Sequence, residues 1–417
     1  MTLSPPAAVP ATGYKPPRQP TSAAVTSLWF VSRSLFTLSL VAAVVLMLDP
    51  TSQNWGLGSS GAVKYLPVIL CVGSVAVNLV ANPLSIMVLL KPANAAMLGL
   101  AVFMAVGSFA AQESTGKDLM FTYMGRAMNI IPFFAAALCM QQGYREALEE
   151  RFGRIIYWGG LVMILLILLS ELKIVFGFRG AFQNQTPLAV GAALAAMWLP
   201  KGRLFKAAWA LLAVGVFLAM GKYTSLLWAI VIFAVFALVN VAPWLFRGGA
   251  PSSGVKSVRT VLAVAAVALL VLLGTALFQS KREVASTDAR WPVFQQRISE
   301  FMESPIYGSH FKSSPLVSIG NLVIPTHNDY LEVLSGGGLV ALGLLLVAVA
   351  AAMSRLLKMY QNGIVNYGYR TAVAGILITS LINMMSNPML FLTATSYMVW
   401  ASLGIMANFS EPARRRP

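Results

Sequence analysis

Residues 326–332 read Thr-His-Asn-Asp-Tyr-Leu-Glu, and residues 336–338 are three glycines at the start of a long apolar run. The stretch sets His327, one of only two histidines in the chain, directly before a segment long enough to cross a membrane. A carboxylate and an amide, Asp329 and Asn328, stand beside it. This order predicts a membrane helix with functional polar side chains at the boundary between lipid and water.

The composition points to the same class of protein. Hydrophobic residues make up 58% of the 417 residues and charged residues only 11%. A chain of this composition has more apolar surface than a soluble domain can bury. Apolar segments recur at 28–49, 64–82, 93–111, 119–141, 155–173, 187–200, 207–220, 226–245, 260–279, 331–354, 371–386 and 389–408. We expect an all-α polytopic membrane protein with about twelve transmembrane helices, the sixth and seventh being short for a bilayer.

The apolar segments also divide the chain. Residues 1–27 are rich in Pro, Ala and Thr and are expected to form a disordered cytoplasmic tail. The first apolar run starts near Leu28 and is long enough to span, so we expect it to remain as the first helix. Residues 28–409 are predicted to form the transmembrane domain, with a large, partly helical periplasmic loop at 280–330, and 410–417 form a basic cytoplasmic tail.

Charge indicates the topology. The chain has 30 Lys and Arg against 14 Asp and Glu, a net charge of +16. The basic residues gather at both termini and in the connections 141–154, 201–206, 246–259 and 355–370, which the positive-inside rule places in the cytoplasm. The excess charge therefore predicts contact with anionic membrane lipids and not with nucleic acid. Cys71 and Cys139 lie in apolar segments, which argues against a disulfide or a thiol site.

Two arginines lie in loops on the opposite side, against this bias. Arg179 lies in the loop 175–185, and Arg290 lies in the long loop 280–326. A planar guanidinium suits two-point binding of phosphate, although nearby carboxylates can also neutralise such loop charges. Arg126 lies inside a span, about 10 Å from its outer end, where it can bind a phosphate or helix carbonyls.

The long loop contains a helical pattern. Four large apolar residues recur at helical spacing: Trp291, Phe294, Ile298 and Phe301. They predict a short amphipathic helix at the outer membrane surface, with its aromatic face packed against the bundle.

Together these pieces resemble the O-antigen ligase and polysaccharide polymerase superfamily. The similar features are the Arg-Trp pair at 290–291, a Pro-x-x-Gly turn at 305–308 and the His-Asn-x-Tyr-Leu element at 327–331, followed by the glycine-rich helix. Residues 178–184, Phe-Arg-Gly-Ala-Phe-Gln-Asn, are similar to the family's Gly-x-Phe-x-x-x-Asn pattern before a helix. Where many members have a Ser-Arg pair, this chain has Lys222, which keeps the charge but loses the guanidinium. The resemblance covers mainly residues 170–400.

The resemblance implies a GT-C-like, inverting glycosyltransferase that needs no metal or cofactor. Such an enzyme, in the bacterial inner membrane with both termini cytoplasmic, takes a glycan from undecaprenyl diphosphate at the periplasmic face. We expect His327 to act as the base on the acceptor hydroxyl, and Arg179 and Arg290 to stabilise the leaving diphosphate. The remaining residues of the expected substrate site are Arg126, Asn184, Lys222, Asn328, Asp329 and Tyr330.

The sequence leaves open which acceptor receives the glycan. A polymerase for exopolysaccharide or O antigen extends the glycan repeat, whereas a ligase of lipopolysaccharide synthesis transfers it to lipid A–core; we favour the polymerase. A flippase or transporter, a scaffold subunit and a protein-directed oligosaccharyltransferase are alternatives. Asp329 or Glu332 is expected to orient His327, unless Glu332 caps the helix. A metal site on these three residues is disfavoured because no second histidine or carboxylate cluster lies nearby.

Overall fold

The computed structural model describes residues 23–48, 61–115, 123–140, 145–172, 174, 185–199, 201–220, 227–232, 287–312, 316–319, 322–361, 368–390 and 393–409. Arg179, Asn184 and Lys222 lie outside these residues, as do residues 1–22, the C-terminal tail, the expected span at 260–279 and most of that at 226–245. Residues 23–27, which we expected in the disordered tail, are helical.

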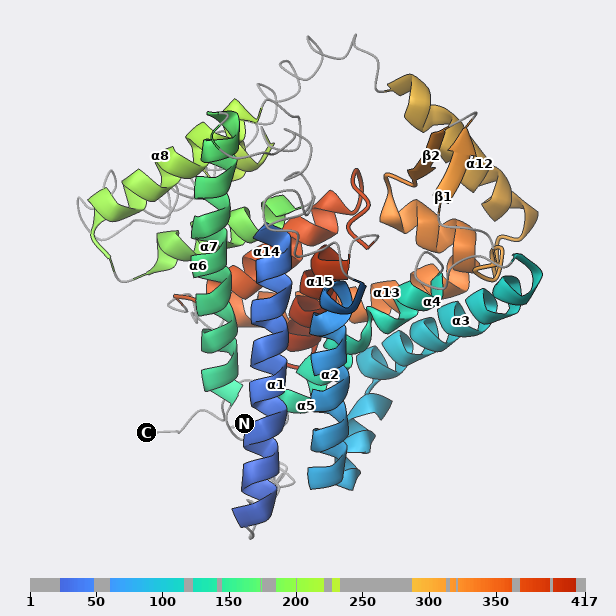
Figure 1. Cartoon of the computed structure of the whole chain (residues 1–417), viewed down its shortest axis with the longest axis horizontal. Helices are drawn as coiled ribbons and strands as arrows, with labels where there is room; N and C mark the ends of the chain where they lie inside the picture. Colours follow the sequence, from blue (N-terminus) through green and yellow to red (C-terminus); the bar gives the residue numbers. More distant parts are fainter. Residues whose placement is uncertain are drawn as a thin grey trace, which may run out of the picture.

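The described part is helical apart from one β-hairpin (Figure 1). Its elements are α1 (Ala23–Leu48), α2 (Gly61–Ala81), the 3-10 helix η1 (Pro83–Leu90), α3 (Pro92–Thr115), α4 (Tyr123–Met128), α5 (Ile131–Cys139), α6 (Arg145–Glu171), α7 (Thr186–Trp198), α8 (Arg203–Ala219), α12 (Thr287–Glu303), β1 (Leu316–Ile319), β2 (Leu322–Pro325), α13 (Asp329–Gln361), α14 (Arg370–Asn383) and α15 (Thr393–Ala407). Residues 227–232 form a further short helical piece.

Five of the described helices are long and apolar enough to cross a membrane. They are Ala23–Leu48, Val63–Ala81, Pro92–Phe109, Leu148–Ser170 and Asp329–Lys358. Shorter apolar helices, α7, α8 and α14 among them, pack with these five. The fold is therefore that of a helical, multi-pass membrane protein, as the composition predicts.

Small residues let the helices of the bundle approach closely. A Cβ atom built on Gly160 of α6 would lie 2.4 Å from the carbonyl oxygen of Leu188 in α7, and one on Gly191 of α7 would lie 3.0 Å from that of Ala372 in α14. Helices in lipid gain little from the hydrophobic effect, so close backbone packing of this kind is what holds them together. Helix α7 is accordingly buried along nearly its whole length.

Two elements differ from the expected spans. The fourth span is not continuous: α4 and α5 are separated by a turn at Asn129 and Ile130. Helix α6 begins at Arg145, well before the apolar run that predicts it, and buries Leu148 and Phe152 ahead of that run. Hydropathy reports which residues suit lipid, and so it misses a helix that continues beyond the bilayer.

The long loop contains the expected helix and an unexpected hairpin. Helix α12 is present, but its buried residues are Val293 and Arg297, whereas Trp291 and Ile298 are exposed. The predicted orientation, with the aromatic face against the bundle, is therefore wrong for this pair. Strands β1 and β2 pair antiparallel just before α13 and lie beside α12 in Figure 1.

Candidate functional site

Helix α13, which follows His327, is broken near its N-terminal end. Gly338 has φ 62° and ψ −161°, so residues 329–337 and 339–361 form two helical parts. This backbone conformation suits glycine, and a Cβ atom on Gly338 would lie 2.3 Å from the carbonyl carbon of Ile306. The triple glycine therefore marks a break within the helix and not its start.

The turn after α12 fills this break. The N–H groups of Leu339 and Val340 donate to the carbonyl oxygens of Pro305 and Ile306 at 2.9 and 3.1 Å. These bonds replace partners that the break removes from the helix. The turn and the second part of α13 are therefore joined through their backbones.

The same turn also receives support from the first part of α13. The N–H groups of Ser309 and Phe311 donate to the carbonyl oxygens of Ser335 and Gly336 at 2.9 and 2.7 Å. The Phe311 ring lies where a Cβ atom on Gly336 or Gly337 would fall, 2.5 to 2.6 Å away. Glycine is required there so that the ring can contact the helix backbone.

Asn328 caps the start of α13. Its Oδ1 accepts a hydrogen bond from the N–H of Leu331 at 3.0 Å, and its carbonyl oxygen accepts one from the N–H of Glu332 at 3.1 Å. This is the usual arrangement of an N-cap asparagine. The cap is therefore Asn328, and the alternative role considered for Glu332 falls away.

Asp329 and Tyr330 attach this helix start to α14 and the turn after it. The N–H of Asp329 donates to the carbonyl oxygen of Met384 at 2.8 Å, and its Oδ2 accepts from the N–H of Leu390 at 3.1 Å. The Tyr330 hydroxyl donates to the carbonyl oxygen of Leu381 at 2.9 Å. Asp329 is buried, so in this structure its carboxylate serves the fold of the helix start.

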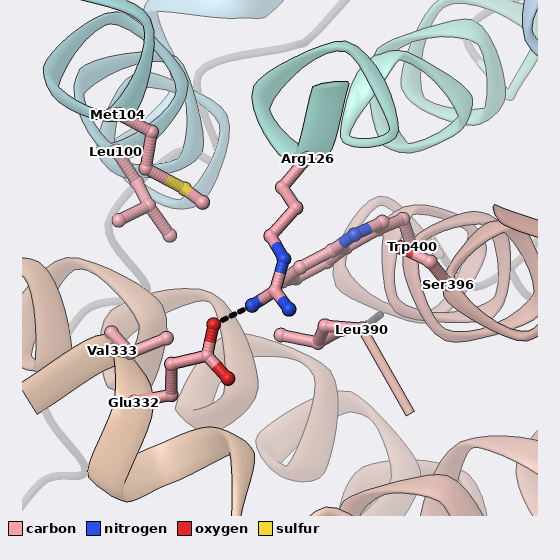
Figure 2. Close-up of a pocket in the computed structure, with 8 residues that line it drawn as sticks. All are labelled: Leu100, Met104, Arg126, Glu332, Val333, Leu390, Ser396 and Trp400. Carbon is pink, nitrogen blue, oxygen red and sulfur yellow. Dashed lines mark hydrogen bonds and ion pairs between the residues drawn. The ribbon is translucent and has the colours of Figure 1, made fainter. Parts of the chain in front are cut away.

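Glu332 forms a buried ion pair with Arg126 of α4 (Figure 2). Apart from Ser396 of α15, the surrounding side chains are apolar and come from α3, α13, α15 and the turn before α15: Leu100, Met104, Val333, Leu390 and Trp400. The cavity beside the pair has room for about one water molecule. A glycan does not fit there, and the guanidinium that we expected at a phosphate or at helix carbonyls is paired with a carboxylate.

His327 lies half-buried between strand β2 and the start of α13. The residue before it, Thr326, is fully buried, and its Oγ1 accepts a hydrogen bond from Arg297 Nε at 3.0 Å. Arg297 Nη1 also donates to Glu300 Oε2 at 2.6 Å. Residues on both sides of His327 are thus fixed, Thr326 by α12 and Asn328 by its cap.

Arg297 is the residue that our reading of the sequence missed. It is 1% exposed and joins α12 to the segment that carries His327. The signal was the spacing from Val293, which puts both residues on one face of α12. A charged residue at a buried helix position has to be paired, and here the partners are Thr326 and Glu300.

Asn383, at the end of α14, connects two further segments. Its Nδ2 donates to Thr186 Oγ1 at 2.9 Å, and its Oδ1 accepts from Trp228 Nε1 at 3.1 Å. Thr186 begins α7, and Trp228 belongs to the helical piece 227–232. Asn383 directly precedes Met384, which holds Asp329, so α7, α14, that piece and α13 meet at one place.

The structure thus brings together five of the expected site residues: His327, Asn328, Asp329, Tyr330 and Arg126. Arg290 lies in the first turn of α12, and Arg179, Asn184 and Lys222 fall outside the described residues. Within the described ranges, no three His, Cys, Asp or Glu side chains are close enough to hold a metal ion. The residue that the sequence suggests as a base, His327, is half-buried among them.

Comparison with known proteins adds no relative. No protein-family model matches the chain, and no curated protein matches it at a significant level. The functional argument therefore rests on the residues and their geometry.

Proposed function

We propose that the protein is a membrane glycosyltransferase, which transfers a glycan from undecaprenyl diphosphate to an acceptor hydroxyl at the periplasmic face and thereby polymerises repeat units. The observation that carries this proposal is the placement of His327. It is half-buried before a membrane-crossing helix and fixed on both sides, by the Arg297 bond to Thr326 and by the Asn328 cap. A reacting group held in one position lowers the entropy cost of reaction.

The reaction requires a base for the acceptor proton and a cation that stabilises the leaving diphosphate. As the acceptor oxygen bonds to the anomeric carbon, the bond from that carbon to the diphosphate oxygen breaks, and the acceptor proton passes to the His327 imidazole. The diphosphate leaves with the bonding electrons, and a nearby cation stabilises it. Arg290 is the described candidate for that cation, because α12 is joined through Arg297 to the residue before His327.

The position of the break in α13 favours surface chemistry over transport. Residues 339–354, which lead from the break to the cytoplasmic Arg355, number 16 and extend about 24 Å, well past the midplane of a hydrocarbon core about 30 Å thick. The break at Gly338 then lies in the outer part of the membrane and not at its midplane. Transporters bind their substrates at broken helices near the midplane, where α13 is continuous.

A reconstituted assay tests the proposal. Purified protein in liposomes receives an undecaprenyl-diphosphate oligosaccharide, with and without lipid A–core, and the products are separated on a gel. A ladder on the undecaprenyl carrier supports a polymerase, and glycan found only on lipid A–core supports a ligase. Intact donor that crosses the bilayer without transfer would overturn the proposal in favour of a flippase.

The two histidines offer a matched pair of variants for this assay. His327→Asn removes the proposed base, whereas His310→Asn changes an exposed histidine with φ 56°, a conformation that asparagine tolerates. We expect transfer to fall by at least about a hundredfold for His327→Asn, the usual contribution of an acid–base group, and to persist for His310→Asn. Full activity of His327→Asn at equal protein abundance would exclude His327 as the base.

A further inference from the structure

The exposed side of α12 consists of two distinct faces. Trp291, Ile298 and Met302 are 56, 44 and 67% exposed and repeat at intervals of seven and four residues, which places them on one face of the helix. Of the exposed polar residues, Gln296, Ser299 and Glu303 lie on the neighbouring face, and Gln295 lies at the edge of the apolar face, four residues from Trp291. The helix therefore has a buried face, an apolar exposed face and a polar exposed face.

The apolar face continues into the turn after α12. Ile306 and Tyr307 in this turn are 57 and 51% exposed. The carbonyl oxygen of Ile306 accepts a hydrogen bond from the N–H of Val340, and that of Pro305 from the N–H of Leu339. We call the set Trp291, Ile298, Met302, Ile306 and Tyr307 the apolar strip. Its end lies beside the start of the membrane-crossing part of α13.

That part of α13 has a lipid-facing side of its own. Four small or apolar residues on one face are fully buried in the bundle: Ala341, Leu345, Ala348 and Ala352. Large apolar residues on the opposite side are exposed: Leu339, Leu346, Val347, Met353 and Leu357. In a membrane-crossing helix, an exposed apolar side of this kind contacts lipid tails. The apolar strip extends this surface beyond the end of the helix.

We infer that the apolar strip is immersed in the outer leaflet of the phospholipid bilayer and seats α12 in the membrane interface. Immersed aromatic and aliphatic side chains on one face, with polar side chains on the next, characterise an interfacial helix. The sequence predicted such a helix with its aromatic face turned to the bundle, whereas the structure turns Trp291 outward. Continuity with the lipid-facing side of α13 identifies the bilayer as the occupant of the strip.

The seating has a consequence for the position of His327, and this consequence rests on the proposed function. The buried face of α12 holds Thr326 through Arg297, so the depth of α12 in the interface sets the depth of His327. The imidazole is thereby kept at the level where the diphosphate of a lipid-linked donor leaves the hydrocarbon. The bilayer then takes part in aligning donor and base.

Site-directed spin labelling of the full-length protein tests the inference without any assay of transfer. Single cysteines replace Ile298 and Met302 on the strip, and matched cysteines replace Ser299 and Glu303 on the polar face. The native Cys71 and Cys139 are buried and are replaced by Ala where they react. In liposomes of phosphatidylethanolamine and phosphatidylglycerol, we measure collision of each nitroxide with oxygen, which concentrates in hydrocarbon, and with a water-soluble nickel chelate.

We expect the oxygen-to-nickel ratio at Ile298→Cys and Met302→Cys to exceed that at Ser299→Cys and Glu303→Cys several-fold. It should approach the ratio at Leu346→Cys, the reference on the lipid-facing side of α13. A ratio as low as that on the polar face would place the strip in water. Little collision with either reagent would mean that protein covers the strip, through another part of the chain or a second copy. Either result overturns the inference and leaves the proposed transferase untouched.

An unlabelled protein gives a second measurement. Brominated phospholipid tails quench nearby tryptophans, and comparison of the wild type with Trp291→Phe isolates the contribution of Trp291. We expect that contribution to be quenched by brominated lipid and protected from iodide in water. Quenching by iodide alone would contradict the seating even where a cysteine variant fails to fold.

Discussion

Arg126 and Glu332, which are 206 residues apart in the chain, form a buried ion pair that joins α4 to the first part of α13. Apart from Ser396 the lining of the adjoining cavity is apolar, so each charge of the pair depends largely on the other for its solvation, although the Arg126 charge also acts on Asp329. The pair holds the helix that begins just after His327.

Removing one partner should therefore cost more than removing both. We expect Arg126→Met or Glu332→Leu alone to lower stability by about 3–5 kcal/mol, because either removes the ion-pair partner of a buried charge, and the double variant to recover much of the loss. Thermal unfolding of the four proteins in detergent gives the coupling between the residues. Additive effects would show that the pair does not act as a unit.

Gly338 should not tolerate a side chain. Alanine there combines a left-handed φ of 62° with a Cβ atom 2.3 Å from the Ile306 carbonyl carbon, so we expect Gly338→Ala to separate the turn from α13 and to destabilise the protein. Gly343 in the same helix is the control, since nothing lies within 4 Å of a Cβ built there. Gly343→Ala should be neutral or stabilising by about 0.5–1 kcal/mol. Equal melting temperatures for the two variants would disprove the break as described.

Arg297 should not be replaceable by lysine. Its Nε binds Thr326 while Nη1 binds Glu300, and one ammonium group cannot reproduce that fork. We expect Arg297→Lys to lower stability by about 1–3 kcal/mol, the cost of a buried polar group left unpaired. Arg154→Lys changes an exposed i,i+4 ion pair with Glu150 and should cost at most about 0.5 kcal/mol.

Measurements of transfer activity can distinguish a role of Arg297 in positioning His327 from a purely structural role. If Arg297 positions His327 through Thr326, then Thr326→Val should reduce turnover in the same way as Arg297→Lys, with little change in KM for the donor. Thr326→Ser keeps the hydroxyl and should restore turnover. Failure of the serine variant to do better than the valine variant would contradict positioning through this bond.

Asn328 can be tested as cap and as substrate ligand at once. Asn328→Ala should cost about 1 kcal/mol of stability through loss of the cap, and Asn328→Ser or Asn328→Asp should restore it. If Asn328 only caps the helix, activity will follow stability across these three variants. A stable Asn328→Ser protein without activity would instead identify the amide as a substrate ligand.

Much of the fold could be predicted from hydropathy, and the reason is physical. A segment such as α1 or α3 has to be apolar over its length to lie in lipid, so its position is visible in the local sequence. The start of α13 was placed nearly correctly for the same reason. What hydropathy cannot show is the turn at Asn129 and Ile130 or the extension of α6. Both depend on packing, and not on contact with lipid.

The candidate site likewise has features that the sequence predicts and features that only the structure shows. The sequence singled out His327 because it stands alone before a membrane helix, and the structure does place it half-buried at that boundary. Arg126, Asp329 and Arg297 each have a partner in a segment distant in the chain, and local spacing carries no sign of these contacts. Glu300, three residues after Arg297 on the same helix, is the partner that local spacing does indicate. Long-range pairing of polar groups is the part that had to come from the structure.

Asn383 is such a long-range contact, and it supplies the last prediction. Its amide bonds both Trp228 and Thr186, so Asn383→Leu removes one hydrogen bond from each of two buried side chains and should cost about 2–4 kcal/mol, from one to three for each bond less a gain in apolar burial. Trp228→Phe together with Thr186→Val removes those two groups, and we expect the triple variant to be less destabilised than the sum of its parts. The indole N–H resonance of Trp228 should shift in Asn383→Leu, because its hydrogen-bond acceptor is gone. An unchanged resonance would show that the bond to Asn383 does not form, and α7 and the piece 227–232 would then have to be joined to α14 by other contacts.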